Sequence, residues 1–420
     1  MNVHANRFPL FDSLRAIAAL SVLLFHAALF RLLTGDSPVR PYTSHLDVGV
    51  TVFFMISGFL LYRPFVRARL NGQESPHVPA YAWRRFLRIA PAYWVALTVV
   101  ALWLSLSGVF TARGIPVYYG FLQIYDTHRV FGGIPQAWTL CVEVTFYAFL
   151  PIWALLMRKV GGGVRREFLA LGLLWLASLA YKVWALEQIS PNSVLSGPYL
   201  QPLPNFLDQF AIGMAVAVLS VHLAQLERLP RWVELLRRHD WIPWVGAVLA
   251  FWVVSTQIGY TGARFESATR RMFLGRHELY ALVALGVLLP ALFATPGRGV
   301  AGRLLASRVL TYLGLVSYGI YLYHFAAVKQ LDDWIGDSIG GPLETQILIH
   351  ALLALLVATV LASLSYYLVE RPALRLKRLV SPPVSAERGE ATEEPINPSS
   401  ATAASTTKAT SAGWRNRGTP

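Results

Sequence analysis

Long apolar stretches recur along nearly the whole chain, with few charged residues inside them. The first reads FDSLRAIAALSVLLFHAALF and covers residues 11–30. An apolar run of about 18 or more residues is long enough to cross a hydrocarbon layer of about 30 Å as a helix. The chain is 55% hydrophobic and only 14% charged, and a soluble core could not enclose so many such runs. The sequence therefore predicts an all-α polytopic membrane protein.

Ten spanning helices are predicted, near residues 11–33, 46–66, 88–108, 136–156, 167–186, 203–223, 241–258, 278–295, 309–329 and 344–369. Basic residues gather in every second loop, starting with the loop between the second and third helices, and such loops face the cytoplasm. Both termini are then expected in the cytoplasm, and the expected location is the inner or plasma membrane. One segment departs from this pattern, because residues 259–277 should lie outside yet contain Arg264, Arg270, Arg271 and Arg276.

The chain divides into a membrane-embedded domain, residues 1–378, and a tail, residues 379–420. The tail is rich in Ser, Thr, Ala, Pro and Glu, a composition typical of disordered segments, and it is expected to be disordered in the cytoplasm. The net charge of +14 comes mostly from the loops, so membrane topology explains it and no nucleic-acid partner is predicted. The lone Cys141 excludes a disulfide framework and gives no metal site, and no metal is expected.

Arg15 and His26 interrupt the first apolar run. The interval between them turns a helix by about 1100°, so the two side chains point within about 20° of each other, about 16 Å apart along the axis. Asp12 lies on nearly the same stripe and could pair with Arg15. Taken singly, each group has an ordinary explanation: Arg15 can reach the headgroups, and His26 can be a satisfied buried histidine.

Two other helices carry ionisable groups at the predicted depth of His26, about 20 Å from the cytoplasmic end. Glu143 lies in QAWTLCVEVTFYAFLP with Tyr147 one turn away, and His324 lies in YLGLVSYGIYLYHF. A carboxylate in hydrocarbon costs several kcal/mol unless it is paired, so one shared polar cavity explains these groups more economically than separate accidents do. A structural pairing of Glu143 with Tyr147, and a structural role for His324, remain alternatives.

The cytoplasmic entry to the third helix reads WRRFLRIAPAYW and places Arg85 and Arg88 one turn apart on one face. Two guanidinium groups at this spacing suit a phosphate or pyrophosphate, although a basic cluster that only sets topology would look the same. In the second helix Ser57 and Gly58 interrupt bulky residues near mid-membrane. Small residues there indicate either close helix packing or a pocket.

Six segments follow in order through nearly all of residues 11–378: FDSLRAIAALSVLLFH, GVTVFFMISGFLLYR, RRFLRIAPAYW, QAWTLCVEVTFYAFLPI, SYGIYLYHF and LVERPALRL. Together they resemble the acyltransferase 3 family of integral membrane acyltransferases, including its Arg, ten residues, His pattern and its Arg-x-x-Arg motif. Thr139 stands where the family more often has Ser, which retains the hydroxyl. The tail is too short and too polar for the hydrolase-like domain of some members, so the chain resembles the stand-alone form.

The resemblance implies transfer of an acyl group from a cytoplasmic acyl-CoA, with acetyl-CoA as the first choice, to a hydroxyl of a cell-envelope glycan, glycolipid or similar acceptor. Arg85 and Arg88 would hold the phosphates of CoA, and Arg15 would help to anchor the pantetheine arm. His26 would act as general base or carry the acyl group for a short time, with Glu143 orienting or charging its imidazole.

Three further residues are expected to contact the acceptor or support the catalytic groups, namely Ser57, Tyr147 and His324. Membrane lipids are the other expected partners, and nothing in the sequence indicates an oligomeric state. A secondary transporter or flippase is the alternative function, since intramembrane His, Glu and Arg side chains also line substrate and proton paths. A noncatalytic sensor is a third possibility, but it leaves the mid-membrane cluster unexplained.

Overall fold

The computed structural model describes residues 8–32, 37–188, 197–259 and 269–380, and over these residues it consists of helices and loops without strands. The long helices are α1 (Leu10–Leu32), α3 (Val48–Leu70), α4 (Val78–Trp103), α6 (Trp138–Val160), α7 (Val164–Glu187), α9 (Leu207–Gln225), α11 (Ile242–Thr256), α12 (Arg270–Phe293), α15 (Ser317–Ile335) and α16 (Leu343–Ser365). The shorter α-helices are α2 (Arg40–Thr43), α5 (Gly114–Tyr119), α8 (Gly197–Leu200), α10 (Arg231–Arg238), α13 (Gly299–Leu305), α14 (Arg308–Leu315) and α17 (Arg371–Arg375). Residues 381–420, most of the predicted tail, lie outside the described residues, as does Arg264.

The predicted fold class is confirmed. Within the described ranges, eight helical segments are long and apolar enough to cross a membrane, and the bent pair of α14 and α15 makes a ninth if it counts as one span. α11 occupies the seventh predicted range, 241–258, but it is a shorter apolar helix than that range anticipated. The cytoplasmic position of the termini stays a prediction.

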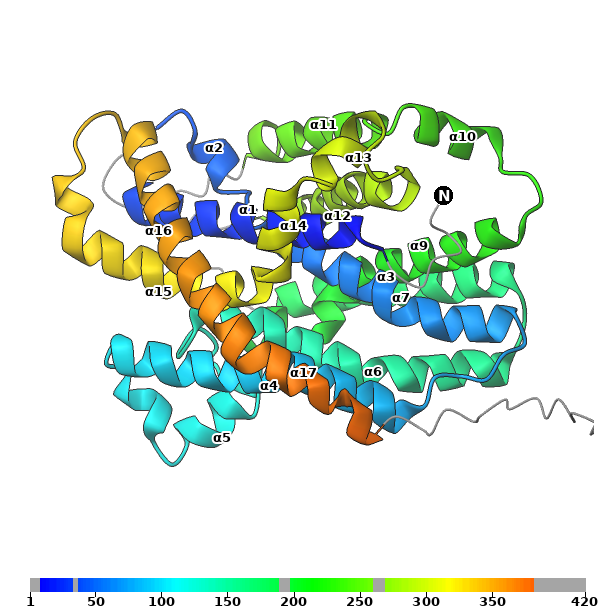
Figure 1. Cartoon of the computed structure of the whole chain (residues 1–420), viewed down its shortest axis with the longest axis horizontal. Helices are drawn as coiled ribbons and strands as arrows, with labels where there is room; N and C mark the ends of the chain where they lie inside the picture. The colour runs from blue at the N-terminus through cyan, green and yellow to red at the C-terminus, as the bar shows by residue number, and fades with distance from the viewer. Residues whose placement is uncertain (1–7, 33–36, 189–196, 260–268, 381–420) are drawn as a thin grey trace, which may run out of the picture. The chain divides into compact units, whose positions relative to one another are not determined.

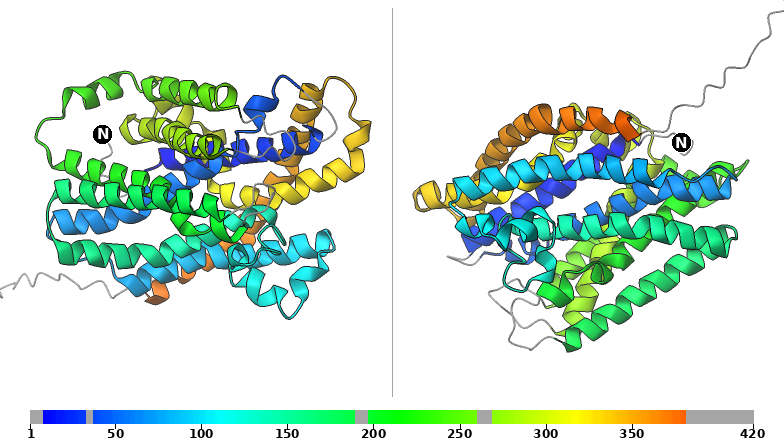
Figure 2. Two further views of the ribbon diagram at one scale, coloured as in Figure 1. Left: turned by 180° about the vertical axis from the view of Figure 1, so that it is seen from behind. Right: turned by 90° about the horizontal axis from the view of Figure 1, so that it is seen from below.

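α1 is the helix around which the bundle is organised, because it packs against α3, α14, α15 and α16. Most of the long helices run alongside one another in Figures 1 and 2, while α16 crosses the others obliquely. A helix surrounded in this way must accommodate its own polar groups inside the protein. This placement is why Arg15 and His26 both border internal cavities.

α3 and α9 approach each other closely at two glycines. A Cβ atom at Gly58 would overlap the backbone of Phe210, and one at Gly213 would overlap the backbone of Met55. Small residues permit this contact between backbones. The structure thus assigns Gly58 to helix packing, whereas its neighbour Ser57 lines a cavity.

The predicted single helix over 309–329 is wrong in one respect, since the chain bends by 76° between α14 and α15. Gly314, near the end of α14, lies where a Cβ atom would overlap the backbone of Asp12 in α1. The hydroxyl of Ser317 donates to the carbonyl of Gly314 at 2.8 Å, which satisfies one of the carbonyls that a helix end leaves unpaired. The bend turns the start of α15 toward a cavity that Tyr318 and Tyr321 also line.

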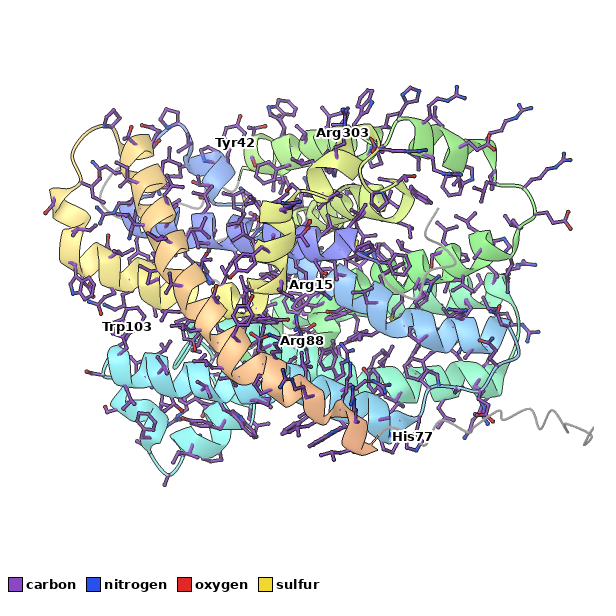
Figure 3. All side chains as sticks on the ribbon, in the orientation of Figure 1. Arg15, Tyr42, His77, Arg88, Trp103 and Arg303 are labelled. Atoms are coloured by element: carbon purple, nitrogen blue, oxygen red, sulfur yellow. The ribbon has the colours of Figure 1, made fainter. Side chains whose placement is uncertain are left out.

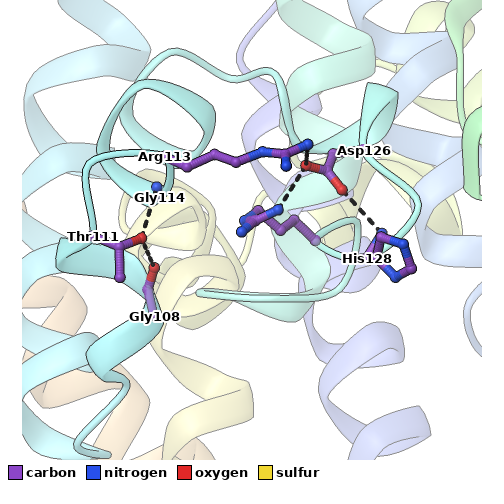
Figure 4. A network of polar contacts seen from close by, with 7 residues as sticks. Gly108, Thr111, Arg113, Gly114, Asp126 and His128 are labelled. Carbon is purple, nitrogen blue, oxygen red and sulfur yellow. Dashed lines mark hydrogen bonds and ion pairs between the residues drawn. The ribbon is translucent and has the colours of Figure 1, made fainter.

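The loop between α4 and α6 is organised by Asp126 (Figure 4). Its carboxylate accepts hydrogen bonds from Arg129 at 2.9 Å and Arg113 at 3.2 Å, and from the backbone amide of His128 at 3.0 Å. In the same loop, the hydroxyl of Thr111 donates to the carbonyl of Gly108 at 3.0 Å. The loop also contributes side chains, beginning with Phe131, to the lining of a cavity.

Asp126→Asn should loosen this loop. Slight desolvation acts to raise the pKa of Asp126, but the hydrogen bonds from Arg129 and the His128 amide and the nearby guanidinium charges lower it below its ordinary 3.8. The stabilisation is therefore present above about pH 4 and is lost as the pH falls through the lowered pKa. For exposed pairs we expect an effect of about 1 kcal/mol or less.

The measurement is the mobility of a spin label at Thr127→Cys, by electron paramagnetic resonance. Asp126→Asn should raise the mobility at pH 7, and acid should raise it in the parent but not further in the variant. Asp333→Asn, which breaks the exposed Lys329–Asp333 pair on α15, is the control and should leave the label unchanged. Equal mobility of the label in the parent and in Asp126→Asn would contradict the role of Asp126.

Candidate active site

Two cavities lie inside the bundle and share two lining residues, Val50 and Tyr321. The first, of about 100 Å³, is the arginine cavity, and its polar lining includes Arg15, Arg85, Arg88, Ser57, Glu143 and Tyr147. The second, of about 320 Å³, is the histidine cavity, and its lining includes His26, Asp47, Arg276, His277 and Tyr280. Because Val50 and Tyr321 border both, they form the wall between the two spaces.

The arginine cavity gathers the cations that the sequence singled out. Arg15 donates to Asp12 at 2.8 Å, which is the pairing that their spacing suggested. Arg88 forms an ion pair with Glu370 at 3.5 Å. Figure 3 places Arg15 and Arg88 in the interior of the bundle, and their charges are close enough to interact. Arg15 is thus paired with an acid one turn away on its own helix, and Arg88 with an acid from a distant segment. Both side chains line the arginine cavity.

Arg85 differs from its neighbours, because within the described ranges it forms no ion pair with an acid. Its guanidinium lies 5.9 Å from the centre of the Tyr147 ring, and its Nε is buried without a hydrogen-bond partner in the described part of the chain. A buried guanidinium needs an anion or hydrogen-bond acceptors to offset its desolvation. The arginine cavity is therefore suited to an anionic ligand at this point.

Glu143 faces the arginine cavity, where its carboxylate accepts a hydrogen bond from the hydroxyl of Ser57 and another from that of Tyr147. The structure thus brings together Glu143, Ser57 and Tyr147, three residues that were expected at the site. It does not place Glu143 in hydrogen-bond contact with His26, which borders the other cavity. Depth along a helix predicted the level of Glu143, but not the side of the wall on which it lies.

His26 and His324 meet as their depths predicted, with 3.1 Å between Nδ1 of His26 and Nε2 of His324. Nδ1 of His324 lies 2.9 Å from the carbonyl of Tyr321, so this nitrogen carries the proton and Nε2 is an acceptor. Nδ1 of His26 faces that acceptor and also the carbonyl of Val22 at 3.0 Å, so it must be the donor. The hydrogen-bond pattern therefore leaves Nε2 of His26 unprotonated in the neutral ring.

Tyr321 forms the polar side of the wall between the cavities. Its hydroxyl lies 2.8 Å from that of Thr139, and its ring packs 5.6 Å from the ring of His324 and 5.5 Å from that of Phe53. The hydroxyl expected at position 139 by analogy with serine is thus used to hold Tyr321. A ligand that extends from one cavity into the other must pass this side chain.

The sequence analysis missed Asp47, which lies just before α3. It is the acid whose charge acts on the imidazole of His26. Asp47 forms an ion pair with Arg276 and accepts a hydrogen bond from Tyr280 at 2.5 Å. The signal was available, because Arg276 belongs to the basic segment that did not fit the predicted topology. Its charge is there to neutralise Asp47.

Glu370 was also missed, although it lies within the LVERPALRL segment. The chain forms a π-helical turn over Tyr366–Glu370, and both oxygens of the buried Glu370 carboxylate lack a hydrogen bond to any described residue. π-helical turns widen a helix and occur often at functional sites. Here the π-helical turn ends at Glu370, which forms the ion pair with Arg88.

Comparison with known proteins extends the resemblance over the chain. A family model described as "Acyltransferase domain" matches residues 9–368. Putative peptidoglycan O-acetyltransferase YrhL of Bacillus subtilis is 25% identical over 88% of this chain, which spans only 55% of that relative's length. Nodulation protein 10 of Rhizobium leguminosarum is 28% identical over 89% of this chain and 94% of its own, and acyltransferase MdmB of Streptomyces mycarofaciens is 25% identical over 88% and 92%. No solved structure matches the chain significantly.

Proposed function

The chain belongs to the acyltransferase family whose model matches residues 9–368, and from this membership we propose that it transfers an acyl group from a cytoplasmic acyl-CoA to a hydroxyl group of a cell-envelope glycan or glycolipid. Acetyl-CoA is the proposed donor. The name of one relative supports an acetyl group, because YrhL is described as a putative peptidoglycan O-acetyltransferase, and MdmB is described more broadly as an acyltransferase.

The observation that carries the proposal is the pair of cavities that meet at Val50 and Tyr321. One contains three arginines and suits a polyanionic donor, and the other contains an imidazole with an unprotonated nitrogen. A reaction between a donor and an acceptor that arrive from opposite sides needs this arrangement. We place the arginine cavity toward the cytoplasm, because Arg85 and Arg88 lie near the start of α4, where basic residues at the end of α3 and the start of α4 predict the cytoplasmic side.

On the donor side, Arg85 binds a phosphate of CoA with the guanidinium nitrogens that have no acidic partner among the described residues. Arg88 adds a second guanidinium one turn away, held in place by Glu370. The pantetheine arm runs past Arg15 toward Tyr321. Glu143, with the hydroxyls of Ser57 and Tyr147, forms the polar surface along which the thioester lies.

On the acceptor side, Nε2 of His26 takes the proton from the acceptor hydroxyl as its oxygen attacks the thioester carbon. The carbon–sulfur bond then breaks, CoA leaves as a thiolate, and that thiolate takes up the proton. Transfer by way of an acyl-imidazole uses the same Nε2 as the nucleophile, with acceptor attack in a second step. Both routes require the tautomer that the carbonyl of Val22 and Nε2 of His324 together set at His26.

A secondary transporter or flippase remains the other function class. Purified protein in proteoliposomes separates the two, because an acyltransferase releases free CoA when acetyl-CoA meets cell-envelope glycan fragments. Exchange of a substrate across the membrane without release of CoA would support transport and contradict the proposal.

Arg85→Gln should weaken donor binding through the phosphates alone. Loss of a charge-assisted hydrogen bond predicts a rise in KM for acetyl-CoA of about tenfold to a hundredfold. KM for S-acetyl-N-acetylcysteamine, a thioester without phosphates, should stay the same. Arg84→Gln is the matched control, since Arg84 is the adjacent arginine and does not line the cavity. An equal change for both thioesters in Arg85→Gln would show that Arg85 does not bind the phosphates.

His26→Ala should abolish transfer, and His324→Leu should lower kcat about tenfold, because Nδ1 of His26 then keeps only the carbonyl of Val22 as its acceptor and the ring is held less firmly. His324→Gln, whose amide oxygen can accept the same hydrogen bond from Nδ1 of His26, should retain most of the activity. The affinity for CoA should be unchanged in all three variants, and His222→Gln, outside both cavities, should behave as the parent. A folded His26→Ala protein that transfers acyl groups at the parental rate would refute the mechanism.

A further inference from the structure

The histidine cavity is lined by four carboxamide side chains, Gln136, Gln201, Asn205 and Gln209, here called the amide quartet. In each, the carboxamide oxygen is buried and accepts no hydrogen bond from any described residue. Three of these side chains are almost wholly enclosed, with exposed fractions of 1% for Asn205, 2% for Gln209 and 3% for Gln136. Buried polar atoms without a partner are rare in folded proteins, so four that line one cavity require an explanation.

The orientation of two of these amides is determined by hydrogen bonds. The side-chain nitrogen of Gln136 donates to the carbonyls of Tyr321 and Leu322 at 2.9 and 3.1 Å, and that of Asn205 donates to the carbonyl of Leu200 at 2.8 Å. An amide whose nitrogen is committed in this way keeps its oxygen as an acceptor. These oxygens can therefore accept hydrogen bonds, and no described residue donates one to them.

The charged groups of the cavity, by contrast, are matched with one another. Asp47 is paired with Arg276 and hydrogen-bonded by Tyr280, and Nε of Arg276 donates to the Tyr280 hydroxyl at 3.1 Å. Nδ1 of His277 lies 3.0 Å from the carbonyl of Phe273. The ligand that completes the cavity is thus an uncharged donor of hydrogen bonds, because the carboxamide oxygens of Gln136 and Asn205, whose orientation is determined, would repel an anion.

The apolar part of the cavity consists of aromatic rings. Trp138 and Phe206 pack with ring centres 5.4 Å apart, and Phe273 and Phe131 line the same space. Rings of this kind bury the C–H faces of a ligand, while a few placed polar groups orient it. With a volume of about 320 Å³ the cavity is at the small end of ligand pockets, which span about 300–1,000 Å³. A single sugar ring combines hydroxyl donors with apolar faces at this size.

We propose that the amide quartet is the acceptor subsite and binds the hydroxyl groups of one uncharged sugar ring, which packs on the aromatic wall beside His26. The identification of this sugar as the acyl acceptor rests on the proposed function. The binding of the sugar does not rest on the proposed function, since it follows from the buried amide oxygens that accept no hydrogen bond from the described residues. Gln209 and Gln201 are the residues that test it best, because their side chains make no hydrogen bond to a described residue that a substitution would remove.

The test is saturation-transfer NMR of the protein in nanodiscs, without any acyl donor, using the methyl glycosides of glucose, galactose, mannose and N-acetylglucosamine. At least one glycoside should bind, and 2-methoxytetrahydropyran, the same ring without hydroxyls, should not. Gln209→Met and Gln201→Met should each raise the dissociation constant of that glycoside by about threefold to tenfold, as expected for one lost hydrogen bond. Gln225→Met is the matched control on α9, about 24 Å from Gln209 along the helix.

Several results would overturn the inference: no glycoside binds, both methionine variants bind as the parent does, or glycerol 3-phosphate binds more tightly than the glycosides. Thermal melting in the same nanodiscs shows whether each variant folds, and either variant alone suffices for the test. Failure of the proposed function is a separate result. Glycoside binding that depends on the amide quartet, without release of CoA in the presence of acetyl-CoA, would keep the subsite and reject acyl transfer.

Discussion

Charged side chains can remain inside an apolar bundle only where another polar group of the bundle neutralises them, and this requirement shapes the described chain. Lys182 and Asp208 are both fully buried and lie 2.5 Å apart, joining α7 to α9. Asp47 and Arg276, which are only partly buried, join the start of α3 to α12. The first pair connects neighbouring long helices, and the second connects helices that are 229 residues apart at the paired positions. The pairs therefore fix how the helices lie around α1, and with it where the cavities form.

Where that requirement is not met by the protein itself, the structure points to ligands. Arg85 borders one cavity without an acid among the described residues, and the amide quartet borders the other without donors. The guanidinium of Arg85, which has no acidic partner in that part of the chain, suits an anion, and the amide oxygens of the quartet suit hydroxyl groups. The two chemistries are those of the phosphates of an acyl-CoA and of a sugar, and they are separated by one tyrosine. His26 lines the histidine cavity with that tyrosine, and its basic nitrogen is set by His324 and the carbonyl of Val22.

The helices could be predicted from the sequence because hydropathy directly determines which segments cross an apolar layer. Two contacts could be predicted as well: the local pairing of Arg15 with Asp12, which depends only on helical spacing, and the long-range meeting of His26 with His324, which depends on depth. Depth does not say which way a side chain points, so the contact of Glu143 with Ser57 could not be derived. The bend before α15 was missed because it arises from contact of Gly314 with α1, and no local pattern records such a contact.

The central claim is that a donor in the arginine cavity presents its acyl group to His26 past Tyr321. The most direct measurement is a cryo-electron microscopy structure of the protein with a thioether analogue of acetyl-CoA that cannot transfer its acyl group. The account predicts density for the phosphates against Arg85 and Arg88, and the acyl carbonyl at the wall formed by Val50 and Tyr321. An analogue with its phosphates in the histidine cavity, or with its acyl group away from Tyr321, would contradict it.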